Sequence, residues 1–166
     1  MNRFRNAIGA GLLGLFALPL AADDGLQNEP HTVLPQIDDL QALGEHARQQ
    51  GVPILLMFAS EECPFCERLE AEVLGPMRLA GDDPRRVLLR KVMLETATEL
   101  RDFQGRGTTA GELAQRREVD MVPTLYLLDA EGHALVPKMV GYTSPDFYPA
   151  YLDQAIEVAR TLMQRH

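Results

Sequence analysis

The two cysteines of the chain, Cys63 and Cys66, enclose Pro64 and Phe65 in a C-P-F-C motif. The motif follows an apolar run at residues 53–59, which predicts a buried strand, and it opens a segment with helical spacing of apolar residues. Cys63 is therefore expected near a helix N-terminus, where unpaired N–H groups and the helix dipole stabilise a thiolate. A Cys63 thiolate can attack a disulfide, and Cys66 can resolve the mixed disulfide. The motif indicates redox chemistry.

Other uses of this cysteine pair fit less well. A structural disulfide that closes so short a loop constrains the unfolded chain little. Structural zinc needs about four ligands, and the histidines are scattered singly through the chain, at His31, His46, His133 and His166. We therefore expect no metal and no other cofactor. A copper(I) site made from both thiolates and a methionine remains an alternative, in which the protein is a metal-binding module.

The N-terminal segment has the layout of a secretory signal peptide. Arg3 and Arg5 precede an apolar stretch at residues 7–20, and two alanines and an acidic segment follow. The expected signal peptide covers residues 1–22 and directs the protein to the periplasm. The alternative is an uncleaved signal anchor, although the stretch is shorter than the roughly 20 apolar residues of a membrane span. After cleavage we expect no stable membrane insertion.

Composition and charge exclude some classes of partner. The 166 residues are 46% apolar and 24% charged, which suits one soluble domain. The formal net charge is −8, and loss of the two arginines of the signal segment makes it −10. Nucleic acid is therefore not an expected partner, because phosphate binding requires a basic patch. In an oxidising compartment, a single vicinal cysteine pair is best explained as a couple that acts on other proteins.

Residues 23–37 are expected to form an extended leader, and residues 38–166 the folded domain. Helices are predicted at residues 38–50, 63–74, 110–119 and 144–163. Strands are predicted at residues 53–59 and 86–94, followed by a hairpin of residues 124–129 and 134–138. Gly75-Pro76 is expected to end the motif helix, residues 105–109 to form a loop, Thr108 or Thr109 to cap the third helix, and Ser144-Pro145 to begin the last.

This order of elements resembles the thioredoxin fold. The resemblance covers roughly residues 54–160 and includes the run from Pro123 to Gly132, followed by Gly141. It implies an α/β domain with a central mixed β-sheet flanked by helices and a short helical insertion before the cis-proline strand. The inserted segment 111–117 and the sequence at residues 140–142 resemble the exported thioredoxin-related proteins of the SoxW type.

The resemblance also implies roles for individual residues. Cys63 is the attacking cysteine, Cys66 the resolving one, and Pro123 a cis-proline that faces their disulfide. The cis bond would turn the backbone of Val122 towards the substrate, so that an extended peptide can pair along it. Without the resemblance, Pro123 would be read as a trans-proline at the first residue of a strand. The substrate-binding residues implied are Pro64, Phe65, Val122 and Thr124.

The chain departs from the thioredoxin pattern beside the motif. Glu62 and Met57 stand where thioredoxins usually have a tryptophan and a buried aspartate that assists proton transfer. Lys91 resembles a thioredoxin lysine of the adjacent strand, although taken alone it would be a surface charge at a strand end. Glu61 or Glu62 can supply a base, but acidic residues there also oppose a thiolate, and a solvated loop face is the alternative.

The sequence thus predicts an exported thiol–disulfide oxidoreductase, most readily a protein-disulfide reductase. Its partners would be protein thiols and disulfides and, by family inference, a membrane electron donor. Two alternatives remain: a disulfide-donating oxidase, favoured by the Pro-Phe dipeptide between the cysteines, and a non-catalytic module that binds a metal or docks onto a partner. A peroxidase is not favoured, because the motif lacks the polar surroundings that such a cysteine needs.

Overall fold

A mixed four-stranded sheet organises the computed structural model, which describes residues 34–97 and 99–164. The strand order is β2-β1-β5-β6. The strands are β1 (Ile54–Ala59), β2 (Leu88–Met93), β5 (Thr124–Leu128) and β6 (Met139–Val140). β1 runs parallel to β2 and antiparallel to β5, so the ends of β1 and β2 and the start of β5 meet at one edge. This edge carries the C-P-F-C motif.

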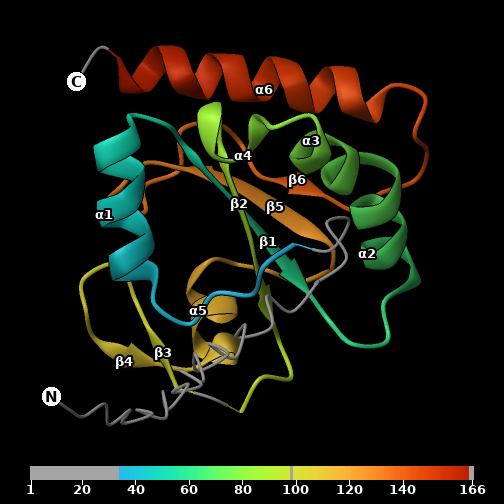
Figure 1. Cartoon of the computed structure of the whole chain (residues 1–166). Coiled ribbons are helices and arrows are strands. Elements are labelled where there is room, and N and C mark those ends of the chain that lie inside the picture. The colour runs from blue at the N-terminus through green and yellow to red at the C-terminus, as the bar shows by residue number, and fades with distance from the viewer. Residues whose placement is uncertain (1–33, 98, 165–166) are drawn as a thin grey trace, which may run out of the picture.

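Helices cover both faces of the sheet (Figure 1). The helical segments are α1 (Leu40–Gln50), α2 (Pro64–Leu69), the π-helical η1 (Glu70–Leu74), α3 (Gly75–Leu79), α4 (Asp82–Arg85), α5 (Ala110–Arg116) and α6 (Tyr148–Met163). α2, η1 and α6 pack on one face, and α1 and α5 on the other. All six side chains of β1 are buried, alternating between the two cores. A strand covered on both faces has this continuous apolar sequence.

The sequence predicted that the motif helix ends at Gly75-Pro76, but the helix continues past these residues. It continues through η1 into α3 and ends at Leu79. The Gly75 N–H donates to the Glu70 carbonyl, five residues earlier, which marks a widened π turn. Proline lacks an N–H and crowds the preceding turn, and the wider turn gives Pro76 room at the start of α3.

The second half of the predicted hairpin is also displaced. Ala134 forms only an isolated bridge with Leu128, and the regular strand β6 begins at Met139. Pro137 interrupts the predicted strand because it has no N–H to donate to a ladder. The predicted loop at residues 105–109 contains a short strand, since β4 (Gly107–Thr108) pairs with β3 (Leu100–Arg101).

Two helix boundaries differ from the prediction. The last helix begins at Tyr148, because the Ser144 hydroxyl accepts the Asp146 N–H and closes a separate turn. α5 ends at Arg116, and Glu118 beyond it has a left-handed φ of 54°. The start of α5 follows one of the two predicted caps, with Thr109 and Glu112 forming a reciprocal capping box.

Residues 34–37, the end of the predicted leader, lie extended beside β2. The Ile37 N–H donates to the Lys91 carbonyl, and the Lys91 N–H donates to the Pro35 carbonyl. The rest of the leader and the predicted signal peptide at residues 1–22 lie outside the described residues. Within the described ranges, none of the helices combines the length and apolar character needed to cross a bilayer.

Candidate active site

Cys63 and Cys66 form a disulfide at the junction between β1 and α2. Cys63 is the N-cap of α2, and its Sγ accepts the Cys66 N–H at 3.1 Å. Pro64 occupies the first turn of α2, where no N–H partner is needed. When the bond is reduced, this N–H and the helix dipole favour a thiolate on Cys63.

Both cysteines are buried. Cys66 is 2% exposed and Cys63 is 5% exposed, and both belong to the core that lies between the sheet, α2 and α6. Phe65, between them, is 52% exposed and extends from the start of α2.

A loop with a cis-proline lies beside the motif. The peptide bond between Val122 and Pro123 is cis. Val122 packs against the same core as the cysteines. Pro123 directly precedes β5, whose first residue, Thr124, pairs with Phe58 near the end of β1. The structure thus brings the loop and the motif together at one edge of the sheet.

Side chains from outside the cis-proline loop, residues 117–123, hold its backbone. Three hydroxyl or ammonium groups donate to loop carbonyls: Thr124 Oγ1 to Met121 (2.6 Å), the Tyr126 hydroxyl to Arg117, and Lys138 Nζ to Glu118. Thr124 is buried, so its hydroxyl serves the loop and is not presented to a substrate. Sequence reasoning did not find Tyr126 or Lys138, because neither is close in sequence to the motif.

A buried ion pair lies behind the motif. Lys91 Nζ is 2.9 Å from Glu70 Oε1 and 3.0 Å from Oε2, and both residues are 8% exposed. The Leu34 N–H donates to Glu70 Oε2 at 2.8 Å. Lys91 is therefore not the surface charge that its sequence alone suggested.

Glu70 is the functional candidate that the sequence analysis missed. It follows Cys66 by one helical turn, and its N–H donates to the Cys66 carbonyl. Residues four apart share a helix face, with Cβ atoms about 5–6 Å apart. Met57, at the position where thioredoxins usually have a buried aspartate, is fully buried in the same core. Glu70 thus provides a buried carboxylate on the motif helix. Its spacing from Cys66 was a usable signal.

The outer face of α2 is joined to the segment before α6. The Tyr142 hydroxyl donates to Glu72 Oε2 at 2.5 Å, and Arg68 lies over the Tyr142 ring and pairs with Glu72. Burial and the neighbouring Glu72 raise the pKa of Tyr142 to about 12. Hydrogen bonds from Tyr142 and Arg68 lower the pKa of Glu72. These contacts fix the motif helix against the start of α6.

The acidic residues before the motif are exposed. Glu61 and Glu62 lie in the turn between β1 and α2. The Glu61 N–H donates to Glu95 Oε2 at 3.2 Å. Glu61 and Glu62 therefore form a solvated loop face, which was the alternative to a role as a catalytic base.

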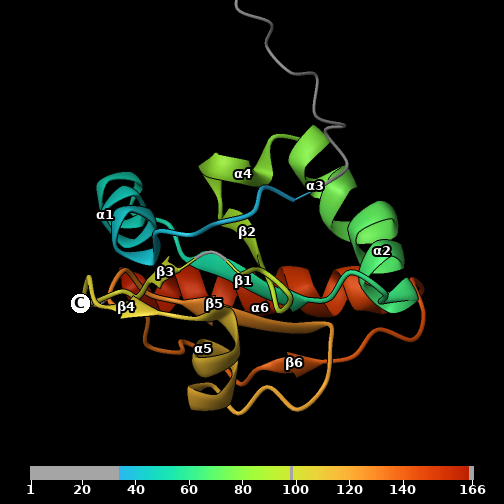
Figure 2. The same cartoon turned by 90° about the horizontal axis from the view of Figure 1, so that it is seen from below.

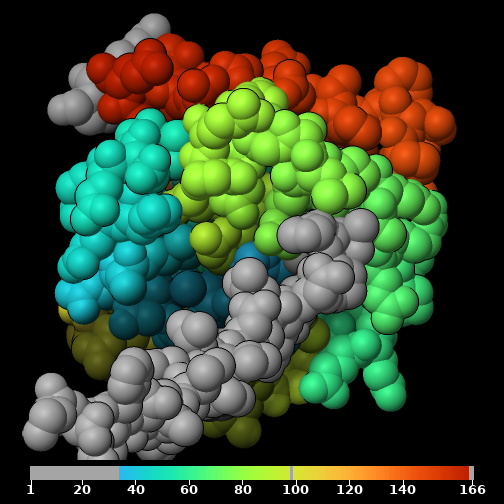
Figure 3. Space-filling view, in the orientation of Figure 1, coloured from blue at the N-terminus to red at the C-terminus, as the bar shows by residue number. Residues whose placement is uncertain are grey.

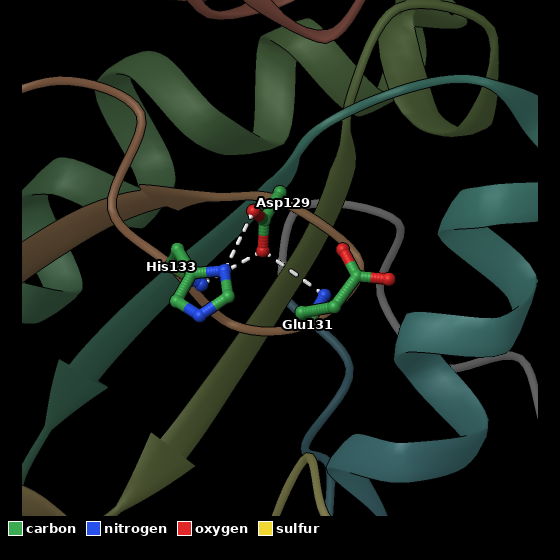
Figure 4. A group of neighbouring side chains, drawn as sticks. All are labelled: Asp129, Glu131 and His133. Carbon is green, nitrogen blue, oxygen red and sulfur yellow. Dashed lines mark hydrogen bonds and ion pairs between the residues drawn. The ribbon is translucent and has the colours of Figure 1, made fainter. Parts of the chain in front are cut away.

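Among the described residues, one group has the composition of a metal site, namely Asp129, Glu131 and His133 (Figure 4). The Asp129 carboxylate accepts the backbone N–H groups of Glu131 and His133 at 2.9 and 2.7 Å and lies 3.0 Å from His133 Nδ1. The Glu131 carboxylate pairs with Arg48 at 2.7 Å. These contacts close the turn after β5, so we assign no metal to it.

The comparisons with known proteins identify the family. Residues 40–156 match the model of the thioredoxin-like domain, and the chain therefore belongs to this family. A search of curated proteins gave no match. Among solved structures, the chain is similar to a DsbH oxidoreductase, with 20% sequence identity and a TM-score of 0.55, over 82% of this chain and 96% of that chain.

Two further structures have lower similarity scores. Thioredoxin O2 from Arabidopsis thaliana, in the oxidised state, has 17% identity and a TM-score of 0.49 over 74% of this chain and 94% of that chain. The periplasmic thioredoxin SoxS from Paracoccus pantotrophus, in the reduced form, has 22% identity and a TM-score of 0.44 over 64% of this chain and 98% of that chain. The family match, with the DsbH similarity, confirms the predicted thioredoxin fold.

Proposed function

We propose that this protein is a thiol–disulfide oxidoreductase that acts on protein substrates through Cys63 and Cys66. The observation that carries the proposal is the disulfide at the N-terminus of α2, beside the cis-proline loop. Membership of the thioredoxin-like family supports it. The reaction needs no cofactor, because the electrons reside on the two sulfur atoms.

In the reducing direction, the Cys63 thiolate attacks one sulfur of a substrate disulfide. A bond forms between Cys63 and that sulfur, and the other substrate sulfur leaves as a thiolate. The Cys66 thiolate then attacks Cys63, forms the Cys63–Cys66 disulfide and releases the second substrate thiolate. Two electrons pass to the substrate, and an external dithiol must return them. In the oxidising direction the same steps run backwards.

Residues around the disulfide can assist each step of the exchange. The N-terminus of α2 stabilises the Cys63 thiolate. Glu70, which pairs with Lys91 and lies one helical turn after Cys66, is the residue that we propose accepts the proton of the Cys66 thiol. The backbone of Val122 is the candidate to pair with an extended substrate segment, as in other strand additions. Glu70 thus takes the role of the missing aspartate.

We further propose that the protein is exported to the periplasm, works there as a reductase and is recharged by a membrane electron donor. The charged and apolar N-terminal sequence supports export. The Pro-Phe dipeptide remains an argument for the opposite direction, that of a disulfide donor.

The reduction potential of the couple tests the direction. The domain is equilibrated with dithiothreitol and glutathione buffers of known potential, and the fraction of oxidised protein is measured. A value near that of thioredoxin, about −270 mV, supports a reductase, and a value near about −120 mV supports an oxidase. A thiol titration with and without copper(I) tests the metal-binding alternative, since that module loses both free thiols stoichiometrically on loading.

A further inference from the structure

The surface on one side of the disulfide is acidic. Glu61 and Glu62 are exposed in the turn before Cys63. Glu95 is also exposed and follows β2, which ends beside β1 because the two strands are parallel. The hydrogen bond from the Glu61 N–H to the Glu95 carboxylate joins the two segments. We call Glu61, Glu62 and Glu95 the acidic flank.

The surface on the other side carries large exposed apolar side chains. Met121, in the cis-proline loop, is 60% exposed, and Val140, in β6, is 51% exposed. Val140 pairs with Thr124, next to that loop. With the exposed Phe65 of the motif they form an apolar flank. In Figure 2, α2 lies above the end of β1 and β6 lies below it. Large apolar side chains gathered around a reactive group indicate a contact surface for a partner.

The described segments next to the disulfide add no lysine or arginine to the acidic flank. Residues 60–67, 94–97 and 119–123 contain no lysine or arginine, and all of them lie in the described part of the chain. They contain two more exposed acids, Glu67 and Asp120. The nearest cation along the motif helix, Arg68, pairs with Glu72. In Figure 3 the segment that joins β1 to α2 protrudes at the lower right of the molecule. These described segments therefore present a net negative charge to a partner.

We propose that the preferred partner is a polypeptide whose cysteine has both basic and apolar residues beside it. The proposal rests on the function proposed above and names its substrate class. The basic side chains contact Glu61, Glu62 and Glu95, and the apolar side chains pack on Phe65, Met121 and Val140. The disulfide lies between the two flanks, so one short segment reaches both. Charge complementarity of this kind acts mainly on the rate of association.

Peptides with a single cysteine test the charge preference. Each carries the cysteine as a 2-thiopyridyl mixed disulfide between leucines and is flanked by lysines, glutamines or glutamates. The reduced protein releases 2-thiopyridone, and the rate constant is divided by that for dithiothreitol with the same peptide. At low salt the lysine peptide should react about tenfold faster than the glutamate peptide. The ratio should shrink at about 1 M salt, where screening extends over only about 3 Å.

Matched variants locate the effect. Glu61→Gln with Glu62→Gln should bring the ratio most of the way to one. Gln49→Lys with Gln50→Lys changes the net charge by the same amount at the end of α1, which precedes β1 and so lies at the opposite edge of the sheet. This control pair should leave the ratio unchanged.

The apolar flank has its own control. Met121→Ser should reduce the preference for leucine over alanine beside the cysteine about fivefold, because it removes one apolar contact. Leu79→Ser, at a similarly exposed position at the end of α3, should not reduce this preference.

Equal normalised rates for lysine and glutamate peptides, or an equal effect of both charge pairs, would overturn the inference and leave the proposed function standing. No exchange with any peptide would contradict the proposed function itself, and this inference with it.

Discussion

The two ends of β5 hold their polar groups in different ways. At the end after Leu128, the Asp129 carboxylate accepts N–H groups from its own turn and lies beside the His133 ring. At the Thr124 end, the carbonyls of the cis-proline loop are held by side chains from outside it, namely those of Thr124, Tyr126 and Lys138, and the Gly141 N–H donates to the Pro123 carbonyl. The first end closes on itself. The second is fixed by neighbouring segments and leaves Met121 exposed, so it can meet a partner beside the disulfide.

The sharpest way to break this comparison is to remove one sulfur at a time. Cys63→Ser should abolish exchange, because no nucleophile remains at the helix N-terminus. Cys66→Ser should abolish turnover but accumulate the mixed disulfide, because nothing resolves it. Non-reducing electrophoresis with a substrate protein distinguishes the two variants. Asp129→Asn, at the other end of β5, should retain turnover, and its loss there would contradict the division between the two ends.

The next largest effect is expected behind the motif. Glu70→Gln leaves the Lys91 ammonium buried without an anionic partner, and breaking a buried pair in this way costs about 3–5 kcal/mol of stability. Urea unfolding of the oxidised protein measures the loss. Lys91→Met should cost a similar amount, whereas the double change Glu70→Leu with Lys91→Met should cost less than either single one. Glu45→Gln, at an exposed position of α1, should have almost no effect.

A smaller effect should separate substrate positioning from redox chemistry. Tyr126→Phe removes the hydrogen bond to the Arg117 carbonyl and keeps the ring that packs edge-on against Phe58. Exchange with a peptide should slow about fivefold, the equivalent of one hydrogen bond of about 1 kcal/mol. Exchange with dithiothreitol and the reduction potential should not change, because they do not need the Val122 backbone. Equal slowing with both reagents would show that the loop does not position peptides.

The smallest effect concerns pH. The pKa of Tyr142 is raised to about 12 in the fold, so its contribution to stability is full below about pH 10 and is lost as the pH rises towards 12. Glu72 has a lowered pKa, so its contribution is present above about pH 4.3 and is lost on acidification. Thermal unfolding from pH 9 to 12 should therefore show a shallower decline for Tyr142→Phe than for the parent. A parallel decline would contradict the role of this hydroxyl.

The strand-to-helix junction at the motif could be predicted because it depends on residues that are neighbours in the sequence. The run at residues 53–59 and the C-P-F-C motif are contiguous, and the buried strand and the helix that begins there follow from them. The prediction of a thioredoxin fold rested on the order of such local segments along the chain. Proline was a less reliable signal for the end of a helix. Pro76 lies inside the continuous motif helix, because the π turn before it makes room for its ring.

The rest of the site depends on contacts between distant residues. Glu70 and Lys91 are 21 residues apart, and their pairing follows from the turn of α2 against β2. Tyr126 and Lys138 reach the cis-proline loop only because β5 and the segment after it fold back beside α5. Hydropathy patterns contain no such information. The spacing of Glu70 from Cys66 was the one local signal, because it places both residues on one face of the motif helix.

The short segment at residues 34–37 covers part of an open edge of the sheet. β2 is at the margin of the sheet, and this segment occupies part of the hydrogen-bonding side that β2 would otherwise present. An open strand edge is a template on which another chain can add. A chain shortened to begin at residue 38 would uncover the backbone of Lys91 and take one donor from Glu70. Its expected fault is aggregation through β2, even with the redox motif intact.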